Sequence, residues 1–115
     1  MGLQMTRIPE TDLYRIRRWA TAKVPEHLWP QVKVEADVAP GHVDIVEVRP
    51  PWNGVGEATR FPIARLRYTK GTGLWAIYWR DRNLKFHEYR RKAPSKQVQT
   101  LLDHIENSGD PIFWG

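Results

Sequence analysis

The chain has 115 residues, of which 41% are hydrophobic and 27% are charged, and its formal net charge is +5 at pH 7. This balance excludes a disordered chain, and the length fits one domain over residues 1–115 with a single core. The lack of Cys excludes disulfides, thiolate metal sites and cysteine nucleophiles. No apolar run reaches the ~18–20 residues that span a bilayer, and no apolar signal segment is present, so we expect a cytoplasmic protein without membrane contact.

The N-terminal part of the chain predicts one helix. Residues 1–8 show no periodicity, and we predict that they are disordered. From Pro9 to Val24 apolar residues recur at helical spacing, and Pro25 lacks the N–H that would continue the helix. Arg15 and Arg18 fall on the side of this helix that is opposite the apolar stripe.

Strands dominate the rest of the sequence. Period-two patterns between turn residues predict five strands, over residues 32–38, 42–49, 61–68, 74–80 and 84–89. Ser95 is the predicted N-cap of a second helix, which ends at Asn107-Ser108-Gly109. Since the connections are short, we predict an α+β domain with an N-terminal helix, a twisted five-stranded antiparallel meander and a C-terminal helix packed on one sheet face.

Positive charge is concentrated in one segment. The range from Arg60 to Lys92 holds ten basic side chains and only two acidic ones, Asp81 and Glu88, which is a surplus of +8. The part before it carries a net charge of −1 and the part after it −2. We therefore expect an anionic partner to bind this segment.

The lengths of two turns decide which of these side chains share a sheet face. An even-length loop after Tyr68 places Arg65 and Arg67 beside Ala76 and Tyr78. An odd-length loop would instead place both arginines in the apolar tryptophan row of the next strand. We favour the even loop, because it keeps cations out of the core.

The second turn is predicted as a two-residue loop, Asp81-Arg82. Trp79 then pairs with Leu84, and Tyr78 pairs with Lys85. The predicted exposed face is basic and aromatic, and it comprises Arg65, Arg67, Tyr78, Arg80, Lys85, His87 and Tyr89.

This face suits single-stranded nucleic acid or another polyanion. Arg and Lys attract phosphates, and exposed rings stack on bases at about 1–3 kcal/mol each. Our leading prediction is a non-enzymatic domain that binds such a partner through this face. The alternative is a solvated face held together by cation–π contacts, with no ligand.

The sequence contains few candidate catalytic residues. His87, flanked by Lys85 and Tyr89, is the one candidate acid or base, and with the nearby arginines it gives the alternative of a toxin-like, metal-independent ribonuclease. The four His show no paired spacing, so we predict no metal and no cofactor.

Large apolar residues outside the predicted elements allow a third function. Trp52 lies in the longest loop, and Phe113 and Trp114 lie near the C-terminus. We favour docking of these side chains on the core. Their alternative role is an interaction patch for a partner or a second copy, and the chain is predicted to be a monomer or a homodimer.

Three stretches carry a resemblance to a known family. They are Phe61-Pro-Ile-Ala-Arg-Leu-Arg-Tyr68, Trp75-Ala-Ile-Tyr-Trp-Arg-Asp-Arg-Asn-Leu-Lys-Phe-His-Glu-Tyr89 and Ile112-Phe-Trp-Gly115. Together they resemble a family of small bacterial proteins that is classified only as a domain of unknown function, and the similarity spans nearly the whole chain. The resemblance implies a bacterial, cytoplasmic protein, and it transfers no activity, cofactor or catalytic residue.

Overall fold

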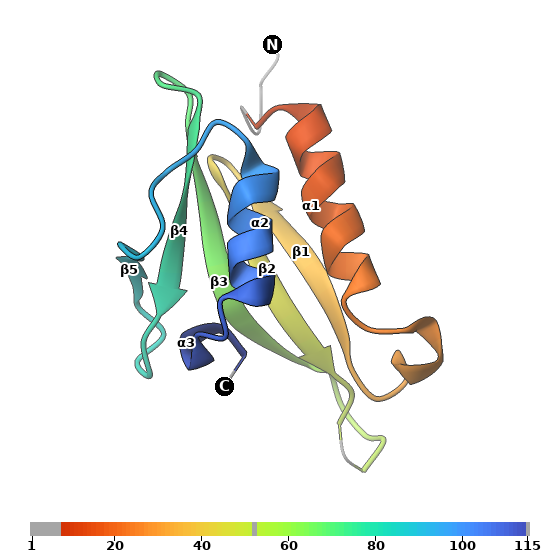
Figure 1. Ribbon diagram of the computed structural model, residues 1–115. Helices are drawn as coiled ribbons and strands as arrows, with labels where there is room; N and C mark the ends of the chain where they lie inside the picture. Colours follow the sequence, from red (N-terminus) through yellow and green to blue (C-terminus); the bar gives the residue numbers. More distant parts are fainter. Residues whose placement is uncertain (1–7, 52, 115) are drawn as a thin grey trace.

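A computed structural model describes residues 8–51 and 53–114 of the chain (Figure 1). Five strands form one antiparallel sheet in the order β1-β2-β3-β4-β5, so that each strand pairs with its neighbours in sequence. The predicted α+β class, the meander and both helices are confirmed. The elements in chain order are α1 (Glu10–Ala22), the 3-10 turn η1 (Glu26–Leu28), β1 (Lys33–Ala39), β2 (His42–Arg49), β3 (Thr59–Thr69), β4 (Leu74–Arg80), β5 (Phe86–Glu88), α2 (Val98–Asn107) and α3 (Pro111–Trp114).

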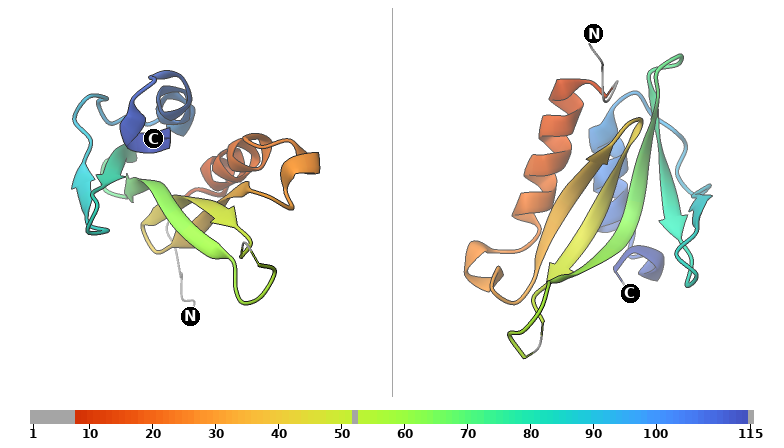
Figure 2. Two further views of the ribbon diagram at one scale, coloured as in Figure 1. Left: turned by 90° about the horizontal axis from the view of Figure 1, so that it is seen from below. Right: turned by 180° about the vertical axis from the view of Figure 1, so that it is seen from behind.

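All helices lie on one face of the sheet. Helix α1 packs along β1, and α2 packs against β4, while no helix of the described residues lies on the opposite face (Figures 1 and 2). The core fills the space between the helices and the sheet, and it contains Ile16, Ile45, Leu66, Trp75, Ile77, Leu101, Leu102 and Ile105 among its fully buried side chains. The sheet therefore has one packed face and one uncovered face.

Helix α1 forms because its apolar residues return to one side. Ile16 and Ala20 are buried, and Asp12 accepts a hydrogen bond from Trp75 Nε1 at 2.9 Å, which ties the first turn to the sheet. The helix ends at Ala22, two residues earlier than predicted, since the residue before Pro25 is disfavoured in helical geometry. Residue Ile8 is buried, and the rest of the predicted disordered stretch lies outside the described residues.

The start of α2 differs from the prediction. Ser95 is not the N-cap: its backbone forms a β-bridge with Trp75, through N···O distances of 2.8 and 2.9 Å, and α2 begins at Val98. Backbone pairing with the open edge of β4 therefore takes precedence over a serine cap. The predicted end is confirmed, with Asn107 as the last helical residue and Gly109 at φ +72°.

Candidate functional site

The register between β3 and β4 gives the uncovered face its basic character. Arg65 pairs with Tyr78, and Arg67 pairs with Ala76, as the even-length loop predicts. Leu66 pairs with Ile77 in the buried row between them. Four of the predicted binding residues therefore share the uncovered face: Arg65, Arg67, Tyr78 and Arg80.

Each arginine of this group rests on an aromatic ring. The guanidinium carbon of Arg67 lies 5.6 Å from the centre of the Tyr78 ring. The corresponding distances are 3.9 Å from Arg65 to Phe86 and 4.1 Å from Arg80 to Phe61. Such contacts limit the side-chain freedom of the cations, which lowers the entropy that a ligand would have to remove.

Carboxylates from β1 and β2 neutralise part of this face. Asp44 accepts two hydrogen bonds from Arg65, at 2.7 Å from Nε and 3.1 Å from Nη2. Arg60 bonds both Glu35 and Asp37, and the bond to Asp37 is the main reason why the pKa of Arg60 is raised. These acidic residues lie outside the +8 segment, so the charge count along the sequence overstates the charge of the face.

Two arginines of the face keep an unneutralised charge. Within the described ranges, neither Arg67 nor Arg80 has a carboxylate partner. Arg80 donates to the carbonyl oxygens of Pro62 at 2.8 Å and Asp81 at 2.9 Å, which fixes its position and leaves its charge in place.

His42 lies next to the arginines of this face. It pairs with Arg67 across β2 and β3 and is half-buried. Burial lowers the pKa of His42, and the positive charges of Arg65 and Arg67 lower it further, against the opposing effect of Asp44. Burial is therefore the main cause of this pKa shift, and the charges around His42 are of both signs.

The turn between β4 and β5 was predicted wrongly. It is a longer loop that closes with a bond from the Asp81 N–H to the Lys85 carbonyl at 2.8 Å. The Asp81 carboxylate accepts from the N–H groups of Asn83 and Lys85, and Leu84 adopts φ +66°. The alternating pattern from Leu84 onward does not predict this loop. A left-handed residue in a turn is usually glycine, but here the hydrogen bonds of the Asp81 side chain to the backbone of the turn allow a leucine to adopt that conformation.

The longer loop moves the side chains of β5 to the opposite face. The observed pairs are Tyr78 with Glu88, Trp79 with His87 and Arg80 with Phe86, in place of the predicted Trp79 with Leu84 and Tyr78 with Lys85. A shift by an odd number of residues reverses the face of every residue in a strand. Three predicted binding residues are therefore not on the uncovered face beside the arginines: Lys85 lies in the turn, and His87 and Tyr89 lie toward the helices.

His87 forms a dyad with Asp81. Its Nε2 lies 2.7 Å from Asp81 Oδ2, and this bond is the first reason why the pKa of Asp81 is lowered. The ring of His87 stacks on Trp79 at 4.8 Å. Arg65 and Arg67 lie on the other face of the sheet, so the cluster of cations that the ribonuclease alternative requires around His87 is not formed.

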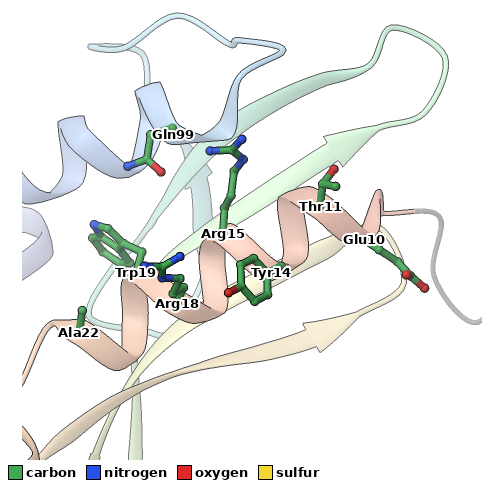
Figure 3. A pocket seen from close by; sticks show the side chains of 8 residues that line it. All are labelled: Glu10, Thr11, Tyr14, Arg15, Arg18, Trp19, Ala22 and Gln99. Atoms are coloured by element: carbon green, nitrogen blue, oxygen red, sulfur yellow. The ribbon is translucent and has the colours of Figure 1, made fainter.

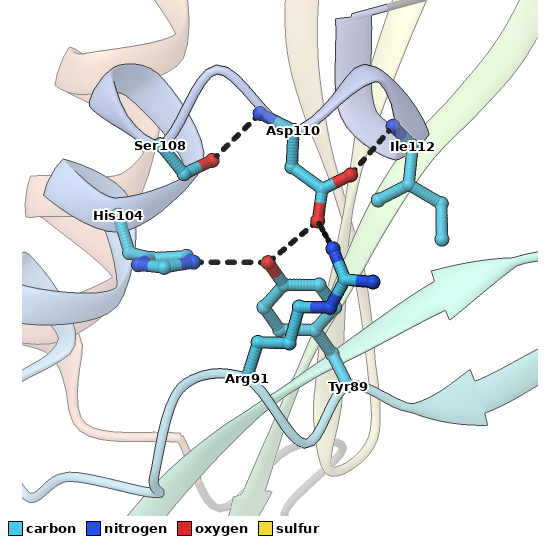
Figure 4. Close-up of polar contacts among 6 residues, drawn as sticks. All are labelled: Tyr89, Arg91, His104, Ser108, Asp110 and Ile112. Atoms are coloured by element: carbon cyan, nitrogen blue, oxygen red, sulfur yellow. Dashed lines mark hydrogen bonds and ion pairs between the residues drawn. The ribbon is translucent and has the colours of Figure 1, made fainter.

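Tyr89 anchors the C-terminal part of the chain (Figure 4). Its hydroxyl donates to Asp110 Oδ2 at 2.8 Å and lies 3.0 Å from His104 Nε2, which must act as the donor because a phenol has one hydrogen. Burial and the bond to Asp110 raise the pKa of Tyr89 to about 12. Arg91 and the backbone N–H of Ile112 complete the bonds to Asp110. This network is structural: it joins the end of β5 to α2 and α3.

Two residues of the predicted interaction patch, Phe113 and Trp114, differ in exposure. Phe113 is buried and stacks on Tyr89 at 4.9 Å, so it docks on the core, as favoured from the sequence. Trp114 donates from Nε1 to the Ile105 carbonyl at 2.9 Å and is 40% exposed. Trp52 lies outside the described residues.

The helical side of the molecule has a groove that was not predicted from the sequence. It has a volume of about 690 Å³, and Figure 3 shows its side chains along α1 with Gln99 of α2. The sequence placed Arg15 and Arg18 on the outer side of the helix. Trp19 follows Arg15 by four positions and Tyr14 precedes Arg18 by four positions, so these aromatic residues lie on the same helix surface as the arginines. That spacing was the available signal.

Residues 8–51 and 53–114 contain neither a metal-ligand cluster nor a membrane-spanning helix. No group of three or more His, Asp or Glu residues there could hold a metal ion. No helix in the same ranges is long and apolar enough to cross a bilayer.

Comparisons with known proteins add a family and no activity. A family model described as a domain of unknown function (DUF3024) matches residues 5–115. No curated protein and no solved structure matches the chain.

Proposed function

The chain belongs to the DUF3024 family of unknown function, and from the geometry of its uncovered sheet face we propose that it binds single-stranded nucleic acid or a related polyanion. The observation that carries this proposal is the pair Arg67 and Arg80. Both cations rest on aromatic rings, and neither has a carboxylate partner among the described residues. The binding surface is smaller than the sequence predicts and is centred on β3 and β4.

The chemistry of this surface matches a flexible polyanion better than a small ligand. Tyr78 is half-buried between Arg65 and Arg67, and its ring can stack on a base while a guanidinium contacts the adjacent phosphate. An open sheet face also has no walls to enclose a small molecule. No second function is proposed, because the surroundings of His87 do not favour ribonuclease chemistry.

The test is the salt dependence of binding to a short fluorescein-labelled oligonucleotide, as RNA and as DNA, followed by fluorescence anisotropy. Two phosphate contacts, one from each arginine of the pair, predict a log–log slope of affinity against salt of about −1.4 for a single strand. The variant Arg67→Glu/Arg80→Glu should lose this binding. Arg65 is left intact, since its substitution would leave Asp44 without a partner and disturb the fold.

A matched control changes the net charge equally at two other exposed sites. Arg17→Glu/Arg49→Glu alters α1 and the end of β2, away from the pair Arg67 and Arg80, and should keep the wild-type slope. Equal loss of affinity in both double variants would show a non-specific effect of net charge. No binding by the wild type at low salt would also refute the proposal.

A further inference from the structure

The groove between helices α1 and α2 is lined by charges of both signs, because Glu10 of α1 lies in it with two arginines of the same helix. Arg15 and Arg18 line the groove on α1, and Gln99 lines it on α2 (Figure 3). Gln99 Nε2 donates to Asp103 Oδ1 at 2.9 Å, so the carboxylate of Asp103 lies directly beside the groove, one turn further along α2.

These charges are not satisfied within the chain. In the part of the chain that the structure describes, Arg15 and Arg18 form no ion pair, and Asp103 bonds only the neutral amide of Gln99. The neighbouring contact between the same helices is complete, since Glu106 accepts from Trp19 Nε1 at 2.9 Å and pairs with Lys23 at 3.3 Å. The helix pair thus has a closed half and a half with unpaired charges of both signs.

We propose that this groove is the interface of a homodimer, in which a second copy of the chain, turned by 180°, supplies the missing charges. A two-fold interface requires a surface that is complementary to itself. Here the cations of α1 in each copy meet Asp103 of α2 in the other. An anionic small molecule would satisfy Arg15 and Arg18 and leave Asp103 unpaired, so a second copy fits the surface better.

The other side chains of the groove are of the types that stabilise interfaces. Tyr14 is 63% exposed, and Trp19 contacts Trp114 with ring centres 6.4 Å apart. Tyr, Trp and Arg are the residue types in which binding energy at interfaces is concentrated. The groove lies on the helical side of the sheet, so dimerisation leaves the uncovered face with Arg67 free (Figure 2).

The proposal is tested by measuring the molar mass as a function of protein concentration. Sedimentation equilibrium without nucleic acid at roughly 1 to 100 µM covers the range in which weak dimers form. The wild type should pass from monomer to dimer. Arg15→Glu/Arg18→Glu should weaken dimerisation by at least about tenfold, because each substituted contact occurs twice in a two-fold interface. Arg17→Glu is the matched control on the same helix: Arg17 does not line the groove, and this variant should dimerise like the wild type.

A charge exchange separates the interface from a loss of folding. Asp103→Arg alone should be monomeric, but its mixture with Arg15→Glu/Arg18→Glu should form a heterodimer, since both contacts then join opposite charges. Native mass spectrometry distinguishes the two masses. A heterodimer can form only if both variants fold.

Three outcomes would overturn this inference: a wild-type mass that stays monomeric over the whole range, equal weakening by Arg17→Glu, or no heterodimer from the two folded variants. If the wild type stays monomeric, a labelled peptide of alternating Glu and Leu can be tested for binding. Binding that is lost when Arg15 is substituted would assign the groove to an acidic partner. Arg67→Glu/Arg80→Glu should dimerise normally, so failure here is distinguishable from failure of polyanion binding.

Discussion

The two halves of the uncovered sheet face use arginine in different ways. On the side next to β1 and β2, Arg60 of β3 bonds two carboxylates of β1, and Arg65 of β3 forms a bidentate pair with Asp44 of β2. In the half formed by β3 and β4, Arg67 and Arg80 rest on rings and carbonyl oxygens. The same residue type therefore holds adjacent strands together in one half and keeps an available positive charge in the other.

The difference comes from the partner strand and not from the arginine itself. Acidic residues of β1 and β2 reach cations that follow them by about twenty positions in the sequence, as Asp44 reaches Arg65. The edge strand β5 contributes only Glu88 opposite Tyr78, and Glu88 has a 3.8 Å contact with Arg90. Charge is available for binding where the neighbouring strand lacks a matching carboxylate.

The largest expected effect is on the neutralised half. Asp44→Ala removes both bonds to Arg65 and should lower the free energy of unfolding by about 1–3 kcal/mol, since the two side chains are only 26% and 17% exposed. It should also raise the affinity for the oligonucleotide by freeing a cation. Urea unfolding measures the stability, with Asp37→Ala, which is exposed, as the milder control. Equal stability of Asp44→Ala and the wild type would show that the ion pair of Arg65 does not stabilise the fold, which would contradict the difference between the two halves.

A second prediction uses two tyrosines that the sequence placed on one face. Tyr89→Phe should lose about 1–2 kcal/mol of stability, because two partly buried hydrogen bonds are removed, whereas Tyr78→Phe should change little. The pKa of Tyr89 is raised, so its contribution is complete below pH 10 and is lost as the pH rises toward about 12. Urea unfolding near pH 8 and pH 11 measures it. Stability that is independent of pH over this range would contradict the network.

The third prediction concerns binding alone. Tyr78→Leu removes the ring beneath Arg67 and should reduce oligonucleotide affinity by about tenfold, the loss of one stacked base. Its thermal stability should stay close to that of the wild type. Anisotropy titration gives the result, and unchanged affinity would exclude stacking on this ring.

The smallest effect is a shift in the titration of His42. Its pKa lies below 6.5 because of burial and the positive charges of Arg65 and Arg67, so Arg67→Gln should raise it. Since the unfolded chain binds the proton more readily, His42 lowers stability as the pH falls from 6.5 through the folded pKa. NMR titration of the imidazole measures both variants. A pKa of His42 that is the same in Arg67→Gln would show that Arg67 does not contribute to lowering it.

The order of elements was predictable because local patterns determine it. Alternating apolar residues fixed β2 and β4, and the even loop after Tyr68 set the β3 to β4 register. Ser95 failed as a predicted cap because backbone pairing with Trp75 is a tertiary contact, which no local rule includes.

The candidate site was predictable only in part. Arg65, Arg67, Tyr78 and Arg80 were assigned to the correct face, but one loop whose conformation depends on Asp81 displaced His87 and Tyr89. The acidic partners were not predicted, for a different reason. Asp44 lies opposite Arg65 because of the register between β2 and β3, and the two turns used for the prediction determine only the registers of β3 with β4 and of β4 with β5.

Mapping of the binding surface by NMR tests the central claim most directly. The backbone amide signals of the ¹⁵N-labelled protein are followed during titration with a short single-stranded oligonucleotide at low salt. We expect shifts that are largest around Arg67, Tyr78 and Arg80 and small around Arg60 and Asp37, where the charges are already paired. Equal shifts in both halves, shifts centred on α1, or no shifts at all would contradict the central claim.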